Sequence, residues 1–375
     1  MLLTRRHFGL GLSVALLSAC TQTGSSLTTQ NDEMKPTPNS DYDLWVQSFF
    51  PRARNAGISQ ATLNAAFQGA GYLPGVVRRD RNQTEFKRSL EDYLSIAVSE
   101  ERVARGREAL TQNRSTLNNL EGTYGVPAEV LAAIWGLESF YGDRRGSVSV
   151  ISATSTLAFD GRRGAFFEAQ LIAALKIVQN GDIAPSKLVG SWAGAMGHTQ
   201  FIPTSYQAFA VDFDGDGRRD IWSDPPDDAL ASAASYLQKN GWQRGVNWGR
   251  EITGSASGTV IQPQANGPRF EVTQNFRAIK RYNNSDAYAI GIGHLSDRIA
   301  GAGPLRTSFP PDANGLTKND RVLLQERLSA RGFDTQGTDG VIGPNSSRAI
   351  SRYQSSIGVD PTGVPSPELL ARLGR

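Results

Sequence analysis

The stretch "LAAIWGLESFYG", residues 131–142, is apolar almost throughout and yet carries one carboxylate, Glu138. Pro127, just upstream in "YGVPAEVL", indicates the start of a helix, because proline is tolerated in the first helical turn. At 3.6 residues per turn, one face of this helix holds Leu131, Ile134, Trp135 and Glu138. The carboxylate is therefore expected to point in the same direction as the apolar side chains.

A carboxyl group among apolar side chains holds its proton more tightly, because burial raises its pKa. A proton held near neutral pH is what a general acid needs, so Glu138 is a candidate catalytic residue. Two structural interpretations stay open on these residues alone. The carboxyl could be hydrogen-bonded inside a core, or it could reach solvent from the end of the helix.

Length, composition and charge exclude several classes of protein. A chain of 375 residues, 39% hydrophobic and 20% charged, has room for two or three globular domains. The net charge of +3 is small and no basic stripe is interleaved with aromatics, so no nucleic acid partner is expected. The only histidines are His7, His198 and His294, and HExxH and CxxC patterns are absent, which argues against a Ser/His/Asp triad and a zinc site.

The N-terminus has the pattern of an export signal. Arg5 and Arg6 precede an apolar run, residues 9–19, which is too short to span a bilayer as a helix. The run ends in "LSAC", which resembles a bacterial lipobox, and Cys20 is the only cysteine of the chain. We therefore predict a lipoprotein signal peptide over 1–19 and a lipidated Cys20. "TRRHF" fits either a twin-arginine signal or an ordinary signal with two chance arginines.

Composition and hydrophobic periodicity divide the remaining chain into segments. Residues 20–40 are polar and rich in Ser, Thr and Pro, as in a disordered tether, and helical periodicity dominates from 41 to about 241. Short β-rich runs are predicted at about 248–282, and a helix returns in "SDAYAIGIGHLSDRIAG", so the main domain is placed at 41–303. A Pro-containing linker, 304–315, precedes two amphipathic helices in 316–375, a unit small enough to favour a binding module over an enzyme.

The segment "GSWAGAMGHTQFIPTSY" combines small residues with Trp192 and Gln200. Glycine and alanine allow a ligand to approach the backbone closely. An aromatic ring and an amide beside them suit a sugar, which offers an apolar ring face and hydroxyl groups. A tightly packed helix-turn explains the same residues equally well.

The segment "VDFDGDGRRD", residues 211–220, begins like an EF-hand calcium loop, with oxygen ligands at alternate positions and glycine at the sixth. The predicted ligands of a structural Ca²⁺ are Asp212, Asp214, Asp216, Asp228 and the backbone carbonyl of Arg218. Position 12 is Ser223 and not glutamate, so a longer loop closed by a following aspartate would be required. A water-solvated Asp/Gly-rich turn is the alternative.

Taken together, the motifs "QTEFKRSLEDYL", "YGVPAEVLAAIWGLESFYG", "GSWAGAMGHTQFIPTSY", "VDFDGDG" and "RYNNSDAYAIGIGHL" resemble those of membrane-bound lytic transglycosylases of the B type. The tail, through "LLQERLSARGF" and "TDGVIGPNSSRAISRYQ", resembles a small helical peptidoglycan-binding domain. The resemblance implies a mainly α protein: a goose-lysozyme-like helical catalytic core with a small β-rich insertion, followed by a three-helix peptidoglycan-binding domain at 316–375.

The resemblance also implies roles for individual residues. Glu138 matches the catalytic glutamate of the family, and no catalytic cofactor is implied. The matching glycan-contact positions are Ser191, Trp192, Gln200, Tyr282, Asn283 and, more weakly, Tyr93 in "EDYL". Where the family often has a tyrosine after a Pro-Arg-Arg turn, this chain has "GRRGAFF", with Phe166 and Phe167, so that hydroxyl group is not expected.

The resemblance implies peptidoglycan glycan strands as the substrate, and on this substrate a single catalytic carboxylate implies a specific reaction. Most glycosidases use two carboxylates. A lone glutamate can protonate the glycosidic oxygen and then, as a base, take the proton of the C6 hydroxyl, which closes a 1,6-anhydro ring. The alternatives are a hydrolytic goose-type lysozyme and a non-catalytic murein-binding lipoprotein. The expected location is the periplasmic face of the outer membrane, with other cell-wall enzymes as potential partners.

Overall fold

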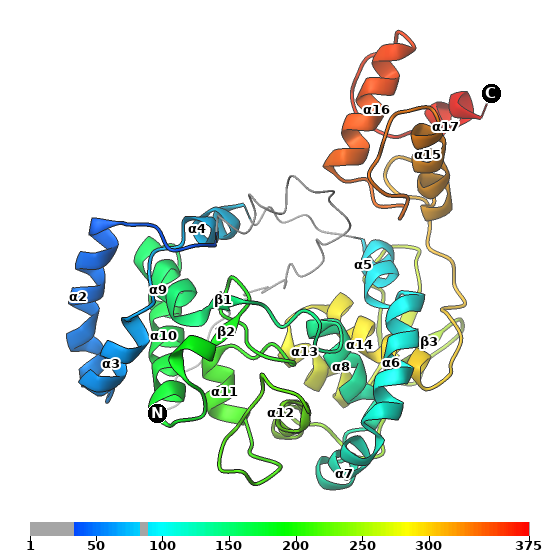
Figure 1. Cartoon of the computed structure of the whole chain (residues 1–375). Coiled ribbons are helices and arrows are strands. Elements are labelled where there is room, and N and C mark those ends of the chain that lie inside the picture. The colour runs from blue at the N-terminus through cyan, green and yellow to red at the C-terminus, as the bar shows by residue number, and fades with distance from the viewer. Residues whose placement is uncertain (1–33, 83–88, 375) are drawn as a thin grey trace, which may run out of the picture. The chain divides into compact units, whose positions relative to one another are not determined.

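The computed structural model describes residues 34–82 and 89–374, and the predicted signal peptide and Cys20 lie outside these residues. The mainly α fold is confirmed (Figure 1). Within the described ranges, no helix combines the length and the apolar character that crossing a bilayer requires. The chain forms two compact units. The first holds Glu100–Asn247, Gln274–Ala302 and the described part of 1–86, and the second holds Trp248–Thr273, Gly303–Arg375 and the described part of 87–99.

The first unit is built from helices and one very small sheet. Its helices are α2 (Ser40–Asn55), α3 (Gln60–Phe67), α4 (Pro74–Arg81), α6 (Glu100–Gln112), α7 (Arg114–Tyr124), α8 (Ala128–Ser139), α9 (Val150–Asp160), α10 (Gly164–Gln179), α11 (Pro203–Phe209), α12 (Asp227–Lys239), α13 (Gln274–Tyr282) and α14 (Asp286–Ile299). The strands β1 (Val148–Ser149) and β2 (Val189–Gly190) pair antiparallel.

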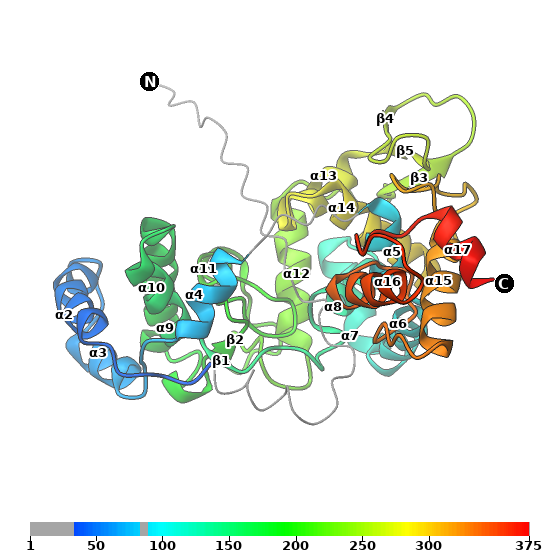
Figure 2. The same ribbon diagram turned by 90° about the horizontal axis from the view of Figure 1, so that it is seen from above.

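Helix α8 is the apolar helix that the sequence predicts. It begins directly after Pro127 and ends at Ser139, because Phe140 takes a left-handed backbone conformation with φ 53°. Helices α6, α7, α12 and α14 all pack against it (Figure 2). Because it is surrounded, its side chains from Leu131 to Ile134 are fully buried, whichever way they point. Glu138 is buried with them.

A second core lies between α4, α9 and α10. It contains Leu73, Val76, Ala153, Leu157, Ala158 and Phe167. Phe166 and Trp192 pack on its edge. The "GRRGAFF" turn is tied down by Asp80 on α4, whose buried carboxylate pairs with Arg162 at 2.5 Å and with Arg163 at 2.6 Å. Phe167 of this turn fills a core position.

The second unit contains α5 (Leu90–Ala97), a sheet and a helical module. The sheet order is β3 (Gly249–Ile252), β5 (Arg269–Val272), β4 (Thr259–Ile261), all antiparallel. The predicted β-rich stretch of about 248–282 is wrong in its last part, because Gln274–Tyr282 forms α13. Phe276 and Ile279 are buried three residues apart, which is a helical and not a strand period.

The C-terminal module of this unit has the three predicted helices, α15 (Lys318–Ala330), α16 (Pro344–Ser356) and α17 (Pro367–Leu373). Thr317 and Asp320 form a reciprocal capping box at the start of α15. The helices enclose a core of Leu324, Leu328, Ile350, Tyr353, Leu369 and Leu373. Leu324 and Leu328, four residues apart on one face of α15, are both fully buried.

A compact loop, residues 190–201, links β2 to α11 and is called the 190–201 loop below. Isolated bridges join Gly190 to Met196 and Met196 to Phe201, so the segment folds back on itself twice. Gly197 has φ +69°, and a Cβ added there would lie 2.1 Å from the backbone oxygen of Ile221. The next amide, that of His198, donates to the same oxygen at 2.9 Å. A side chain at Gly197 would break this contact.

We expect Gly197→Ala to lower the melting temperature more than Gly181→Ala. Gly181 also has a positive φ, +83°, but nothing lies within 4 Å of its added Cβ. The control therefore carries only the backbone strain, roughly 1–2 kcal/mol, whereas Gly197→Ala adds a clash with main-chain atoms. Melting curves of the two variants measure the difference, and equal losses would show that the loop adapts to the methyl group.

Candidate active site

Glu138 lies in the last turn of α8 with only 5% of its surface exposed. Its Oε1 accepts a hydrogen bond of 2.6 Å from the hydroxyl of Tyr288 on α14. Burial raises the pKa of Glu138 to about 7, although the Tyr288 hydrogen bond opposes this rise by stabilising the ionised form. The carboxyl group is therefore poised to give up or take back a proton near neutral pH.

Tyr288 is a site residue that the sequence analysis did not identify. It lies within the motif "RYNNSDAYAIGIGHL", in the first turn of α14, where Ser285 caps the helix. The signal was a hydroxyl-bearing aromatic in a helix that is otherwise rich in small and apolar residues. Its partner could not be read from the sequence, because Glu138 is 150 positions away along the chain.

Tyr282, at the end of α13, joins this group. Its ring stacks on that of Tyr288 with centroids 6.4 Å apart, and its hydroxyl donates to the backbone oxygen of Thr199 at 2.7 Å. Burial and the nearby Glu138 carboxylate raise the pKa of Tyr282, so it stays a neutral donor. The structure thus brings Glu138, Tyr282 and the end of the 190–201 loop together.

Gln200 and Asn283 carry polar atoms that have no protein partner. Gln200 has φ 51° and is buried, and its Nε2 donates to the backbone oxygens of Arg145 and Gly197 at 3.1 and 2.8 Å. The Oε1 of Gln200 and the Oδ1 of Asn283 are buried acceptors without a hydrogen bond. Strained backbone and unsatisfied acceptors are costly, and they are typical of residues kept for a ligand.

Ser191 and Trp192 lie at the other end of the same loop. The amide of Ser191 donates to the backbone oxygen of Ala195 at 2.7 Å, while its hydroxyl accepts from the amide of Ala195 at 3.1 Å. Trp192 is half-buried on the α4–α9–α10 core. Tyr93, the remaining predicted glycan contact, lies on α5 and belongs to the second unit.

His198 connects α8 to the segment around Ser223. It is fully buried, and its Nδ1 accepts from the indole of Trp135 at 3.0 Å. Its Nε2 lies 3.0 Å from the backbone oxygen of Ser223 and 2.9 Å from Nη1 of Arg145. Burial lowers the pKa of His198 to about 4, and the nearby Arg145 guanidinium adds to this effect. His198 is therefore neutral and structural at pH 7, and not a proton donor.

The acidic loop between α11 and α12 brings three of the predicted metal ligands together. The carboxylate oxygens of Asp212, Asp214 and Asp216 lie within 4.8 Å of one another, and all three residues are exposed. Asp212 accepts from the amides of Gly215 and Gly217, which preserves the tight turn. Carboxylate oxygens converging on one point are the donor set that Ca²⁺ prefers, so these three residues fit the ion.

Asp228 and Arg218 contribute differently. Asp228 is buried at the start of α12, and its oxygens accept from the amides of Phe213 and Asp220 at 2.7 and 2.8 Å. Burial raises the pKa of Asp228 to about 6 in spite of these hydrogen bonds. The cluster of converging carboxylates does not include Asp228, which instead holds the two ends of the loop against α12. Arg218 is exposed, and its amide donates to Asp216.

Comparisons with known proteins define the class. Residues 41–260 and 253–297 match the family described as the transglycosylase SLT domain, and residues 317–373 match a peptidoglycan binding domain. The chain therefore belongs to the transglycosylase SLT family, as its sequence motifs predicted.

Individual relatives agree with this assignment. The membrane-bound lytic murein transglycosylase B of Escherichia coli (strain K12) is 31% identical over 242 residues, which are 56% of this chain and 66% of that protein. SltB3 of Pseudomonas aeruginosa, crystallised with NAG-NAM-pentapeptide, is 41% identical with a TM-score of 0.70, over 88% of this chain and 99% of that one. Escherichia coli lytic transglycosylase Slt35, solved with calcium, is 28% identical with a TM-score of 0.60, over 72% and 97%.

We expect Tyr288→Phe to raise the pKa of Glu138 further. The lost hydrogen bond favours the ionised carboxylate, so its removal shifts the titration to higher pH. Titration of the ¹³C-labelled glutamate side chains by NMR would measure the shift. Tyr282→Phe is the matched control, because its hydroxyl donates to Thr199 and not to Glu138. A Glu138 titration unchanged in Tyr288→Phe would contradict the assigned contact.

Proposed function

We propose that this protein is a lytic transglycosylase that cleaves the β-1,4 bond between MurNAc and GlcNAc in peptidoglycan and leaves 1,6-anhydro-MurNAc ends. The observation that carries the proposal is the buried Glu138 carboxyl, whose pKa lies near 7 and responds to burial and to one tyrosine. Membership of the transglycosylase SLT family supports the same reaction class.

The first step uses Glu138 as a general acid. Because Tyr288 donates to Oε1, the acidic proton of the neutral carboxyl is carried by Oε2. Transfer of this proton to the glycosidic oxygen breaks the C1–O bond of the muramoyl residue and releases the other sugar. The substrate's own N-acetyl oxygen stabilises the cationic C1, so the reaction needs no second protein carboxylate.

The second step uses the same residue as a base. The ionised Glu138 is stabilised by the Tyr288 hydroxyl and takes the proton of the C6 hydroxyl of the muramoyl residue. The C6 oxygen then bonds to C1 and closes the anhydro ring, which returns Glu138 to its protonated state without consuming water. A hydrolytic lysozyme would instead add water at C1 and release reducing ends, and mass spectrometry of products from purified murein distinguishes the two.

Five side chains of the first unit complete the proposed glycan site. The buried acceptors of Gln200 and Asn283 would receive hydrogen bonds from hydroxyl or N-acetyl N–H groups of the sugar, which removes their unsatisfied state. Trp192 would offer an apolar face to a sugar ring, and Ser191 and Tyr282 would flank it. Tyr93 is proposed separately, as a glycan contact of the second unit by itself.

Location and retention follow from the two ends of the chain. We infer that a lipid on Cys20 anchors the protein at the periplasmic face of the outer membrane and that the C-terminal module holds murein. The lipobox and the match of residues 317–373 to a peptidoglycan binding domain support these roles. The name of the Escherichia coli relative describes that protein as membrane-bound.

We expect Glu138→Gln to abolish cleavage, with a loss of about 10⁴-fold or more in kcat on murein, because one group serves both proton transfers. Glu129→Gln, the same change in the first turn of the same helix, should stay active. A Glu138→Gln variant that keeps a tenth of wild-type activity would exclude Glu138 from the mechanism.

The same variant should be more stable than wild type at alkaline pH. The pKa of Glu138 is raised from 4.5 to about 7, so its stabilising contribution is complete below pH 4.5 and is lost as pH rises through 7. Wild type should therefore lose about 3 kcal/mol of unfolding free energy from this residue between pH 4.5 and 8, and the glutamine should not. Denaturant unfolding at the two pH values measures this difference.

We also propose a structural Ca²⁺ at Asp212, Asp214 and Asp216. The ion would offset the repulsion of three exposed carboxylates in a loop that Asp228 already holds in place. Calcium should then raise the melting temperature by mass action. Asp212→Asn with Asp216→Asn should cancel that rise while keeping the turn acceptors. Asp334→Asn with Asp339→Asn is the control. Each of these side chains also accepts a hydrogen bond from a backbone amide, in both cases the amide two residues later in the chain. Identical melting in chelator and in millimolar calcium would exclude the site.

A further inference from the structure

The connection between α8 and β1, residues 140–147, lies against the 190–201 loop. Gly146 in this connection has φ +85°, and a Cβ added there would lie 2.3 Å from the backbone oxygen of Gly190 and 2.6 Å from the amide nitrogen of Ser191. Two residues later, Val148 pairs with Gly190 as β1 meets β2. Backbone therefore contacts backbone where the connection passes the start of the loop.

Arg145, the residue before Gly146, meets the other end of the same loop through its main chain. Its carbonyl oxygen accepts from Nε2 of Gln200 at 3.1 Å, and the carbonyl oxygen of Gly197 accepts from the same nitrogen at 2.8 Å. A side-chain amide nitrogen carries two hydrogens, so both are used. Within the described residues, the buried Oε1 of Gln200 is the end of this side chain that has no partner.

The side chain of Arg145 fixes the same main-chain position from another direction. Its Nη1 donates to the backbone oxygen of Trp222 at 2.8 Å and lies 2.9 Å from Nε2 of His198. Nη1 also pairs with Asp224 at 3.1 Å, but this carboxylate is 68% exposed, so the pair contributes little to stability. Trp222 is itself anchored, because its indole donates to the backbone oxygen of Val189 on β2 at 3.1 Å. Among the described residues, these polar contacts of the guanidinium all involve the one nitrogen Nη1.

We propose that Arg145 is a positioning residue that keeps Oε1 of Gln200 open to the glycan, so that this position selects a sugar group that donates a hydrogen bond. The inference rests on the proposed function, because Gln200 is one of the proposed glycan contacts. If the amide were turned over, Nε2 would be the open end and the position would require an acceptor. The carbonyl oxygens of Arg145 and Gly197 exclude that orientation, since it would place Oε1 against two further acceptors and leave all three without donors.

The orientation of Gln200 can be measured in wild type, without any substitution. Because both hydrogens of Nε2 are bonded to buried carbonyl oxygens, they should exchange with water about tenfold or more slowly than those of the exposed Gln68. NMR of protein labelled with ¹⁵N-glutamine measures both rates, and Gln200→Met assigns the signal. Equal exchange rates would overturn the proposal.

Arg145→Met tests the positioning role in the full-length protein. We expect KM for a soluble murein tetrasaccharide to rise about threefold or more while kcat changes less than about twofold, because binding is what weakens. Arg105→Met is the matched control. It removes an ion pair of similar exposure, 38 and 52% for Arg105 and Asp143 against 33 and 68% for Arg145 and Asp224. A KM of Arg145→Met equal to that of the control would contradict the positioning role.

Arg145→Lys is the conservative variant. Since one nitrogen makes all the polar contacts of the guanidinium, a single ammonium group can take its place, and KM should return to within about twofold of wild type. A lysine variant as impaired as Arg145→Met would show that the contact with Trp222 does not position Gln200.

A double variant separates positioning from general support of the fold. If Arg145 acts through Gln200, Arg145→Met should change KM less than about 1.5-fold in a Gln200→Met background, because the two effects are not additive. A rise as large as in the wild-type background would show a purely structural role and overturn the inference. Failure of wild type to cleave both the tetrasaccharide and murein would instead refute the proposed function, and the exchange rates of Gln200 do not depend on that result.

Discussion

Burial of the Glu138 carboxyl is the constraint on which the first unit depends. An ionised carboxylate is expensive to remove from water, so a buried one must hold its proton or find a donor. Here it does both: its pKa lies near 7, and Tyr288 donates to it. The hydrogen bond requires α8 and α14 to pack side by side, and the α13–α14 connection then places Tyr282 against Tyr288. The same packing of α8 against α14 therefore positions Glu138, Tyr288 and Tyr282.

The 190–201 loop of the first unit contains backbone conformations that are locally unfavourable. Gly197 and Gln200 both have positive φ, and the loop is held by the buried neutral His198, which bridges Trp135 on α8 to Ser223. This neutral imidazole connects the apolar helix to the loop without adding a charge. The Oε1 of Gln200 keeps an open acceptor in a buried place. Rigid surroundings of this kind are what a preorganised sugar site requires.

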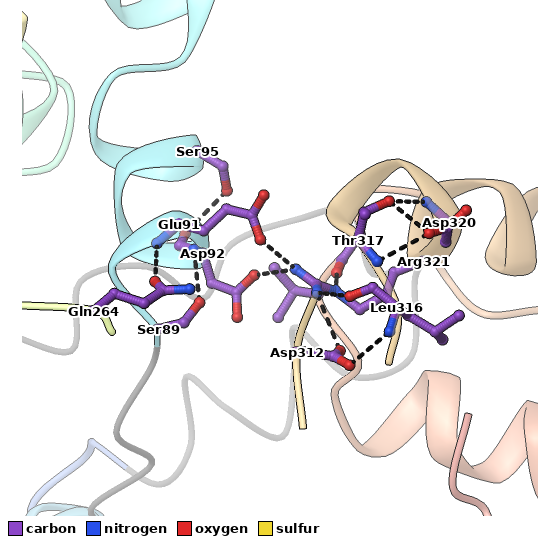
Figure 3. A network of polar contacts seen from close by, with 12 residues as sticks. Ser89, Glu91, Asp92, Ser95, Gln264, Asp312, Leu316, Thr317, Asp320 and Arg321 are labelled. Atoms are coloured by element: carbon purple, nitrogen blue, oxygen red, sulfur yellow. Dashed lines mark hydrogen bonds and ion pairs between the residues drawn. The ribbon is translucent and has the colours of Figure 1, made fainter. Parts of the chain in front are cut away.

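The second unit depends on a different interaction, a buried arginine among three carboxylates. Arg321 donates both to carbonyl oxygens of its own module and to carboxylates of α5 (Figure 3), and the module and α5 belong to one compact unit with the sheet. The match to a peptidoglycan binding domain begins at residue 317. Contacts in the structure instead group α5 and strands β3, β4 and β5 with the C-terminal module. Domain boundaries drawn from sequence texture follow composition, and compact units follow contacts between distant segments.

The sequence by itself determined the features that repeat at short range: the mainly α fold, the apolar helix that carries Glu138, two amphipathic helices in the tail, and the acidic turn with Asp212, Asp214 and Asp216. The third helix of the C-terminal module followed only from the family resemblance. Helical period and turn chemistry are local and can be read directly. It misassigned Gln274–Tyr282 as β-rich, because short mixed runs are ambiguous until packing selects a face. Only the tertiary structure decided four further roles: Tyr288 as the partner of Glu138, His198 as a neutral bridge, Asp228 as a backbone anchor, and the ion pairs of Arg321 on α15 with α5. Each of them joins segments whose separation in sequence carries no signal.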